Sequence, residues 1–448
     1  MKIRNIVRSV AAASVVIAVP AAAEQFGPLE ITGFAKDEYS FCDNCSEGLV
    51  NPSPYDPRGV LSPPDPMVNQ PGDTSFLGKN LGLVMLRADL SHEFDNAVKI
   101  DAVAAVRMRN WDADIYDNWM TDIYGSVSHP VYGSLAAGKM SSRSWTRTDG
   151  FAYPFGLSSP WAEGGAGYGL YPEAVRYATP LEEIPWGKVM FEATYAQADT
   201  RKPLNPTSTV PGQGPPDPWL FEVFVQYSNE KNLVELIYQQ SEGGRQSSFS
   251  KGAFYGAQGN TNGPDPSPYY ETPWENVLVL QGNYWLNPQW KFTYGVKRSA
   301  WSGQAQQCDY GPVTPEESAC YWDQAGFNYS DDVNRAYSAV EYDFLLGAAY
   351  SKELWTYSLG GVYMGNASTR NPVNWGQDNS ATFLVLSAHR QMPEIWKNIE
   401  FYVNLERVMF SDRGPAPISM PSNLAFGQVD PRVSESANTL VVGANITF

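Results

Sequence analysis

Three histidines are the residues whose ordinary pKa would suit acid–base chemistry near neutral pH: His92, His129 and His389. Nucleophilic catalysis requires such a base within hydrogen-bond distance of a serine or cysteine. Ser91 and His92 are neighbours, so in a strand their side chains point to opposite faces and cannot form this pair. His129 precedes Pro130 in a turn, and the chain has no zinc-protease, P-loop or serine-hydrolase motif. We therefore predict that the protein is not an enzyme.

The four cysteines are a second candidate for chemistry. Cys42 and Cys45 are three residues apart, and Cys308 and Cys320 are twelve apart, in connections rich in Gly, Pro and Asp. A metal or redox motif is the competing interpretation of the first pair, but no second C-x-x-C and no haem-attachment histidine accompany it. Local disulfides, Cys42 to Cys45 and Cys308 to Cys320, fit an exported protein better.

Carboxylates are the most abundant functional groups. Asp112, Asp114 and Asp117 could bind Ca²⁺, which prefers oxygen ligands, although a solvated acidic loop has the same composition. We predict no cofactor, with Ca²⁺ at such an acidic loop as the open alternative. The chain has 48 acidic and 31 basic residues, for a formal net charge of −17. Phosphate binding requires a basic surface, so nucleic acid is excluded as a partner.

The N-terminal stretch 1–23 has the pattern of a secretory signal peptide. Lys2, Arg4 and Arg8 precede an apolar stretch of about ten residues, and Ala21 and Ala23 form an A-x-A cleavage pattern. A membrane anchor would need roughly 20 apolar residues. We predict cleavage before Glu24, which removes three basic residues and no acidic one and takes the formal charge from −17 to −20.

The elements that must position these groups are strands. Segments of alternating apolar and polar residues recur along one continuous domain, 24–448, and aromatic residues, Gly and Pro are abundant. Sixteen such segments are predicted, at 28–41, 79–94, 97–110, 121–128, 131–140, 173–180, 188–198, 219–228, 232–240, 276–286, 290–301, 335–350, 354–364, 379–390, 398–410 and 437–448.

The connections between these segments alternate between long and short. Long stretches such as 141–172, 241–275 and 302–334 alternate with short turns such as "SNEKN" and "SKE". A soluble β-sandwich gives no reason for this sorting. A transmembrane antiparallel up-and-down β-barrel does, because its periplasmic turns are short and its extracellular loops are long. This all-β barrel of about sixteen strands is the predicted fold.

The two faces of individual strands agree with a barrel in lipid. In "KVMFEATYA" an oily face with Phe191 and Tyr195 opposes a face that carries Glu192 and Thr194. A charged face is unsuited to a dry core but is ordinary in a hydrated lumen, while the apolar face contacts lipid. Closure of the barrel also removes the exposed sheet edges.

The last strand carries the most specific signal. "TLVVGANITF" alternates to the final aromatic residue, Phe448, and the chain also has the opening strand "ITGFAKDEY" and the strand "VYGSLAAGKM", which runs into a Gly-rich loop. With these features the chain resembles the Gram-negative general porins over essentially all of the mature sequence. The resemblance implies that Phe448 is an assembly signal read by the barrel-assembly machinery.

The resemblance also implies a water-filled pore that the third extracellular loop narrows by folding into the barrel. That loop lies near 141–172, and its acids Glu163 and Asp149 and its bases Arg143 and Arg147 are the predicted constriction residues. Porins of this family pair acids on the loop with a basic wall, which creates a transverse field. The candidates for this wall are Lys36, Arg87, Arg107, Arg109, Lys139 and Arg176, and about half are expected to pair only with lumen acids such as Asp89 and Asp101.

The resulting hypothesis is an outer-membrane porin for passive diffusion of small hydrophilic solutes and ions. Its acidic connections, such as 302–334, predict a mild preference for cations. The expected setting is the outer membrane of a Gram-negative bacterium, with a homotrimer in contact with outer-membrane lipid and lipopolysaccharide. The alternatives are a substrate-selective channel of the same architecture and, third, a non-conducting adhesion or structural barrel.

Overall fold

The structure is a computed structural model in which part of the chain is described. The described residues are 24–26, 28–46, 74–109, 120–148, 161, 170–197, 219–242, 274–301, 339–366, 368–369, 380–395, 397–411 and 435–448. The predicted signal peptide, the acids Asp112, Asp114 and Asp117, the loop acids Glu163 and Asp149, and the pair Cys308 and Cys320 lie outside these residues.

One antiparallel sheet contains every strand in the described part of the chain. Three strands are only two or three residues long: β1 (Glu24–Phe26), β8 (Glu182–Ile184) and β16 (Ser368–Thr369). The other sixteen are β2 (Leu29–Ser46), β3 (Thr74–Glu93), β4 (Lys99–Arg109), β5 (Met120–His129), β6 (Gly133–Ser141), β7 (Leu170–Ala178), β9 (Gly187–Gln197), β10 (Trp219–Ser228), β11 (Asn232–Glu242), β12 (Trp274–Trp285), β13 (Trp290–Trp301), β14 (Ala339–Lys352), β15 (Trp355–Met364), β17 (Ala381–Gln391), β18 (Ile399–Phe410) and β19 (Ser436–Thr447).

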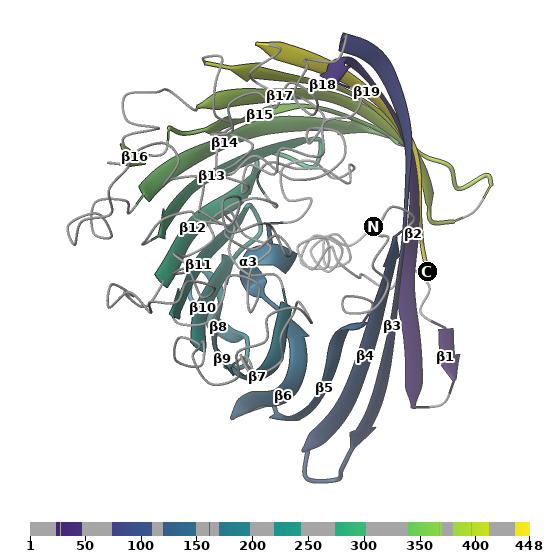
Figure 1. The fold of residues 1–448 in the computed structure, drawn as a ribbon. Helices are drawn as coiled ribbons and strands as arrows, with labels where there is room; N and C mark the ends of the chain where they lie inside the picture. The colour runs from purple at the N-terminus through teal and green to yellow at the C-terminus, as the bar shows by residue number, and fades with distance from the viewer. Residues whose placement is uncertain are drawn as a thin grey trace, which may run out of the picture.

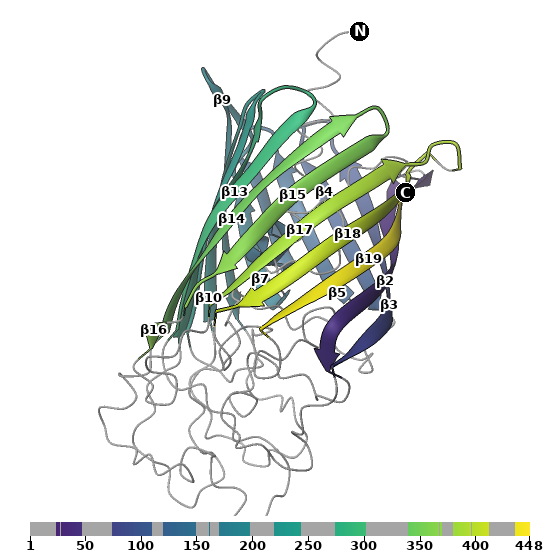
Figure 2. The same cartoon turned by 90° about the horizontal axis from the view of Figure 1, so that it is seen from above.

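The sixteen long strands close into a barrel, which Figures 1 and 2 show from two directions. Each strand pairs with the next in the chain, and β19 pairs with β2 to complete the ring. Beyond β19, Gly33 and Phe448 exchange backbone hydrogen bonds of 2.9 and 3.0 Å. The predicted fold class is therefore confirmed. The predicted strand at 219–228 has the same bounds as β10.

Side chains alternate between the two faces of the barrel wall as the sequence predicts. On β13, Phe292 and Val296 are exposed on the outside, whereas the residues that follow each of them, Thr293 and Lys297, are buried on the inside. On β9, Phe191 is exposed and Glu192 is buried. Such a wall has an apolar outer surface for lipid and a polar inner surface.

Short turns join the strands at one end of the barrel. The described turns at 94–98, 130–132, 229–231, 286–289 and 353–354 each connect two neighbouring strands. At the opposite end, β6 continues into α3 (Arg143–Thr146), a single helical turn that Figure 1 shows inside the ring of strands. None of the helices among the described residues is long and apolar enough to cross a membrane.

Candidate functional site

The stretch Ser141–Thr148, called the inner segment below, is the described part of the chain that follows β6 into the barrel. Ser142 is the N-cap of α3, and its Oγ accepts a hydrogen bond of 3.0 Å from the backbone N–H of Trp145. The hydroxyl of Thr146 donates to the carbonyl oxygen of Ser142 at 2.7 Å. Serine at the N-cap stabilises a helix start because it accepts from an amide that has no partner in the helix.

A wall glutamate holds the start of this turn. Glu222 on β10 accepts hydrogen bonds from the backbone N–H groups of Arg143 and Ser144, at 2.8 and 3.0 Å on separate oxygens. Its side chain is buried, and the guanidinium of Arg176 on β7 lies 3.6 Å away. Glu222 therefore joins the inner segment to the barrel wall and contributes negative charge beside two arginines.

Two arginines of the inner segment form ion pairs with further wall glutamates. Arg143 binds Glu192 on β9 through two parallel hydrogen bonds of 2.5 and 2.7 Å. Arg147 binds Glu235 on β11, with its Nε 2.8 Å from Oε1. The two parallel hydrogen bonds of Arg143 fix the direction of its side chain as well as pairing its charge. Glu192, Glu222 and Glu235 sit on three consecutive strands of the wall, and we call them the acidic wall.

The electrostatics of Arg143 follow from this pairing. Burial alone would lower its pKa, but the carboxylates of Glu192 and Glu222 outweigh that effect and raise the pKa above its ordinary value. Arg143 is therefore a lasting positive charge beside these carboxylates.

Two glutamines extend the contact between the inner segment and the wall. Gln239 on β11 donates to Ser144 Oγ at 3.0 Å and to Glu222 at 3.2 Å. Gln281 on β12 donates to the carbonyl oxygen of Arg147 and to Glu235, at 2.9 and 2.8 Å. These hydrogen bonds link the side chains of the wall to the inner segment in one network. A buried polar network of this kind makes the cluster rigid.

Trp161 docks on the same side of the wall. Its indole N–H donates to Gln281 Oε1 at 2.8 Å, and its ring covers Lys297 of β13 at 5.3 Å. The ring lies against Gly295, where an added Cβ would be 2.5 Å from it, so that only glycine leaves room. Lys297 forms an ion pair of 2.8 Å with Asp343 of β14, and both are almost fully buried.

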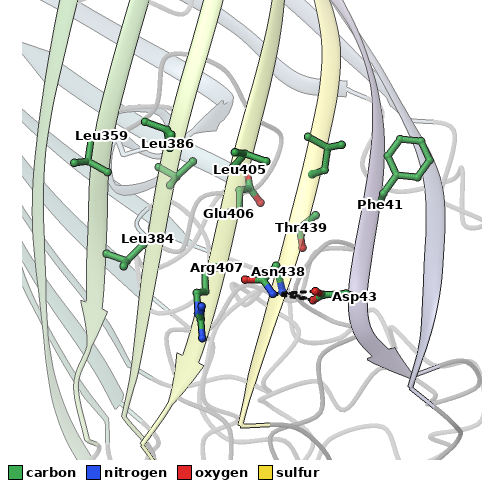
Figure 3. A pocket seen from close by; sticks show the side chains of 12 residues that line it. Phe41, Asp43, Leu359, Leu384, Leu386, Leu405, Glu406, Arg407, Asn438 and Thr439 are labelled. Atoms are coloured by element: carbon green, nitrogen blue, oxygen red, sulfur yellow. Dashed lines mark hydrogen bonds between the residues drawn. The ribbon is translucent and has the colours of Figure 1, made fainter.

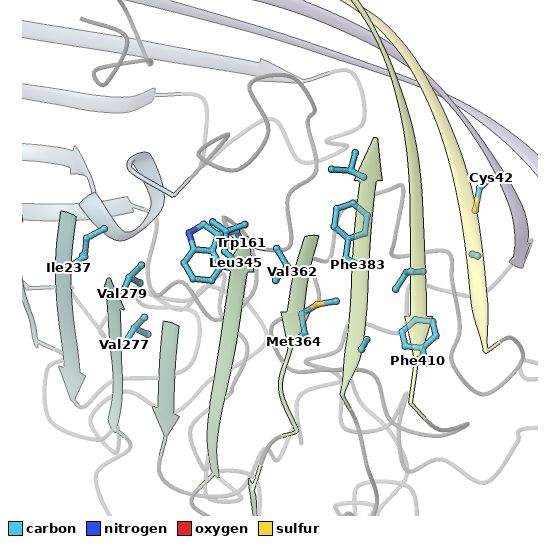
Figure 4. Close-up of a cluster of buried hydrophobic side chains, with 14 of the residues drawn as sticks. Cys42, Trp161, Ile237, Val277, Val279, Leu345, Val362, Met364, Phe383 and Phe410 are labelled. Atoms are coloured by element: carbon cyan, nitrogen blue, oxygen red, sulfur yellow. The ribbon is translucent and has the colours of Figure 1, made fainter. Parts of the chain in front are cut away.

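A buried apolar cluster continues the inner wall beyond Trp161 (Figure 4). Besides Trp161, its members lie on β2, β10, β11, β12, β14, β15, β17, β18 and β19, and include Ile237, Val279, Leu345, Val362, Phe383 and Phe410. The inner wall is therefore not uniformly polar. On the same strands, buried polar side chains such as Asp343, Ser387 and Asn404 stand beside the apolar ones.

All six residues of the predicted basic wall lie on strands between β2 and β7, as their sequence positions require. Arg87 forms an ion pair of 2.7 Å with Asp89, while Asp101 pairs with Lys99 at the same distance. Arg107 lies 4.8 Å over the ring of Trp145, on the inner segment. Lys36 is on β2 and Lys139 on β6, Arg109 ends β4, and nothing is described of the Arg109 side chain.

Arg176 belongs to the network around the inner segment. It donates to Thr194 Oγ1 and to the carbonyl oxygen of Ser141, each at 2.8 Å. It thus stands between the acidic wall and the inner segment. The remaining predicted basic residues are distributed along the preceding strands.

The described residues reveal a charge arrangement that sequence reasoning missed. Here the inner segment supplies cations, Arg143 and Arg147, and the acidic wall supplies the anions that hold them. The loop acids Glu163 and Asp149, which were predicted to face a basic wall, lie outside the described residues, so that prediction stays open. The signal available in the sequence was the lumen-facing parity of three glutamates on successive strands.

The three histidines do not come together. His92 lies on β3 with its ring against Phe94, His129 ends β5, and His389 is buried on β17. Within the described residues, no group of three or more His, Cys, Asp or Glu side chains could hold a metal ion. Cys42 is buried on β2, where the pairing with β3 shifts register between Cys42 and Cys45.

Replacing Asp343 by asparagine is expected to destabilise the barrel by about 3 kcal/mol, because Lys297 would lose the carboxylate that offsets its burial. The measurement is the midpoint of denaturant unfolding in detergent, followed by tryptophan fluorescence. Arg390→Gln, which breaks an exposed pair with Glu394, is the matched control and should change stability by less than about 1 kcal/mol. Equal effects of both substitutions would contradict the importance of the buried pair.

Comparison with known proteins gives the fold a context. No family model matches the chain, and no curated protein matches it by sequence. Solved structures do. The anion-selective porin of Comamonas acidovorans is 12% identical with a TM-score of 0.56, covering 94% of this chain and 99% of that one.

Two further structures have similar scores. In-vitro folded OmpT, an outer membrane protein of Vibrio cholerae, is 12% identical with a TM-score of 0.54, covering 96% of this chain and 100% of that one. The outer membrane channel DcaP of Acinetobacter baumannii is 12% identical with a TM-score of 0.54, covering 94% and 97%. The chain therefore has the fold of the Gram-negative outer-membrane porins, a closed antiparallel barrel of sixteen long strands.

Proposed function

We propose that this protein is an outer-membrane porin that lets small hydrophilic solutes and ions diffuse passively across the outer membrane of a Gram-negative bacterium. The observation that carries the proposal is the closed barrel with an apolar outer face and an inner segment held inside it. A segment held inside the lumen narrows the pore. It does not enclose a site for a reaction. The likeness to porins and channels favours a channel over an enzyme in the same way.

The constriction is proposed to lie at the inner segment. Arg143 and Arg147 are anchored there on the acidic wall, and Arg107 stacks on Trp145. Glu163 and Asp149 would add loop acids opposite the basic residues of β2–β7. Charges of opposite sign on the two sides of a narrow opening would separate the paths of cations and anions.

A mild preference for cations is part of the proposal. The mature chain has a formal charge of −20 after removal of its three basic N-terminal residues, and a rim of one sign concentrates counterions. The Comamonas neighbour is named for its anion selectivity, so the shared fold does not set the sign. The charges of this chain must set it.

The proposed assembly is a homotrimer surrounded by outer-membrane lipid and lipopolysaccharide. One of the similar structures, OmpT of Vibrio cholerae, is described in a trimer form and has a TM-score of 0.51. Insertion would depend on the barrel-assembly machinery. No cofactor is proposed, and Ca²⁺ at Asp112, Asp114 and Asp117 remains the open alternative.

Single-channel recording in planar bilayers tests the proposal. The refolded protein is expected to add stepwise conductance that rises with salt and stays open at low voltage. In a salt gradient, the zero-current potential should be displaced toward the equilibrium potential of the cation. A barrel that inserts but carries no current would sink the porin and favour the adhesion or structural alternative.

A substrate-selective channel is the second candidate, because part of the inner wall is apolar (Figure 4). A selective channel would be blocked in a saturable way by its solute, whereas a diffusion pore would show conductance that varies smoothly with solute size. Titration of sugars, amino acids and aromatic acids into the same recording distinguishes the two.

The proposed bridge between Cys308 and Cys320 has its own test. Non-reducing peptide mapping of the exported protein is expected to link the two cysteine peptides to each other. In the chain-entropy model, closing this loop of about a dozen residues would stabilise the ordered connection by roughly 3 kcal/mol. Alkylation of either cysteine without prior reduction would contradict the bridge.

A further inference from the structure

The outer surface of the barrel has a groove over β15, β17, β18, β19 and β2 (Figure 3), with a volume of about 420 Å³. Nine of its twelve lining residues come from two adjacent rows of paired residues in the sheet, and the other three, Val385, Glu406 and Thr439, lie between these rows and are buried. The leucine row crosses all five strands and consists of Leu359, Leu386, Leu405, Leu440 and Phe41. The polar row lies two residues farther along and consists of Arg407, Asn438 and Asp43, with Leu384 before them on β17.

Both rows face outward. Leu359, Leu386 and Leu405 are 61, 52 and 54% exposed, while their strand neighbours Val385 and Glu406 are buried on the inside. Arg407, Asn438 and Asp43 are also exposed. The leucine row thus belongs to the surface that contacts lipid, and the polar row marks its edge at the end of the strands opposite the short turns.

Arg407 has no ion pair or hydrogen bond within the part of the chain that the structure describes. The carboxylate of Asp43 is directed to Asn438, which donates to it from the backbone N–H at 2.6 Å and from the side-chain amide at 2.9 Å. Asp43 is two strands from Arg407, roughly 10 Å at the usual strand spacing. Arg407 therefore presents its guanidinium beside an apolar groove, and none of the described residues pairs with it.

A cation on the lipid-facing surface is unfavourable near the middle of a membrane and becomes acceptable at the interface, where an anionic head group can pair with it. Arginine matches phosphate because its planar fork donates two parallel hydrogen bonds. The adjoining leucine row offers apolar surface for the acyl chains attached to such a head group. The guanidinium and the adjoining apolar surface thus fit the two parts of one ligand, the phosphate and the acyl chain of a phosphorylated lipid.

We propose that this groove binds a phosphorylated lipid of the outer leaflet, with its phosphate on Arg407 and an acyl chain along the leucine row. The proposal rests on the outer-membrane setting proposed above. It deepens that setting by assigning a site to one lipid class on one face of the barrel.

Native mass spectrometry of the refolded protein in detergent tests the site, because it counts bound lipids without any measurement of conductance. The probes are bis-phosphorylated lipid A, its dephosphorylated counterpart and inorganic phosphate. Arg407→Gln is expected to weaken binding of the bis-phosphorylated lipid roughly tenfold, the loss of a charge-assisted hydrogen bond. Binding of the dephosphorylated lipid, already weaker, should not change.

Arg390→Gln is the matched control, since Arg390 faces outward near the other end of β17 but already pairs with Glu394 at 2.8 Å and covers Trp355. It should leave lipid binding unchanged. Leu405→Ala should weaken binding of both lipids alike, because it removes acyl contact and no charge. Refolding of each variant is checked by its heat-dependent migration in gels.

Three outcomes would overturn the site. Equal binding of the two lipids would remove the phosphate from the proposal. Displacement of bound lipid by millimolar inorganic phosphate alone would make it a free-phosphate site. Loss of oligomer mass in Arg407→Gln, with no lipid bound to the parent protein, would identify the face as a subunit interface. A protein that binds lipid as expected but carries no current would fail the porin proposal alone.

Discussion

Replacing Glu222 by glutamine is expected to shift the ion preference of the pore toward anions, with a change in permeability ratio on the order of fivefold. The substitution keeps nearly the same side-chain volume, but the glutamine NH2 cannot accept one of the two backbone hydrogen bonds from Arg143 and Ser144. An unchanged single-channel conductance would show that the opening has not widened. Around the inner segment it leaves Arg143, Arg147 and Arg176 facing two carboxylates instead of three. The measurement is the zero-current potential across a planar bilayer in a salt gradient.

The salt dependence of this shift provides an internal check. A fixed charge acts over a Debye length that falls from about 10 Å at 0.1 M salt to about 3 Å at 1 M, so the shift should shrink as salt rises.

Glu183→Gln is the control for Glu222→Gln. Glu183 lies on β8, fully exposed, where its hydrogen bond with Lys188 lowers its pKa. It should have little effect on selectivity because open water surrounds it. Equal shifts from the two substitutions would show that the acidic wall is not near the path of the ions.

Deleting Phe448 is expected to reduce insertion into the outer membrane of cells to a small fraction, while the protein refolded in detergent keeps most of its conductance. The deletion removes the backbone hydrogen bonds that Phe448 exchanges with Gly33, worth together about 2 kcal/mol, from a ladder that otherwise stays intact. The assembly signal implied by the resemblance would be lost completely. Quantitative blotting of membrane fractions and bilayer recording measure the two effects.

Gly33→Val separates the structural role of this corner from the role of the terminal residue. A Cβ at Gly33 would lie 2.4 Å from the carbonyl oxygen of Met85 and 2.9 Å from the ring of Phe448. The variant keeps its terminal aromatic residue but cannot close β2 against β3 without a shift. It should fail in both assays. If deletion of Phe448 also fails equally in both, Phe448 is structural only.

The strands were predictable because their signal is local. An alternation of period two needs only neighbouring residues, and it placed β10 and β13 at their observed bounds. The ends were less accurate where pairing outlasts the apolar pattern. The prediction of 28–41 stopped short of β2, which runs to Ser46 through an irregularity between Cys42 and Cys45. There the backbone pairing with β3 continues, and the pattern of neighbouring residues in the sequence does not predict that pairing.

The sequence by itself determined that Glu192, Glu222 and Glu235 face the inside, since parity along a strand decides the face. Only the tertiary structure decided what they bind. Arg143 and Glu222 are 79 residues apart, and their contact depends on where the chain after β6 turns into the barrel. On the outer face, Arg407 meets the leucine row through the register of β17, β18 and β19. Register is set by pairing across the whole ring, so residues distant in sequence become neighbours only when the barrel closes.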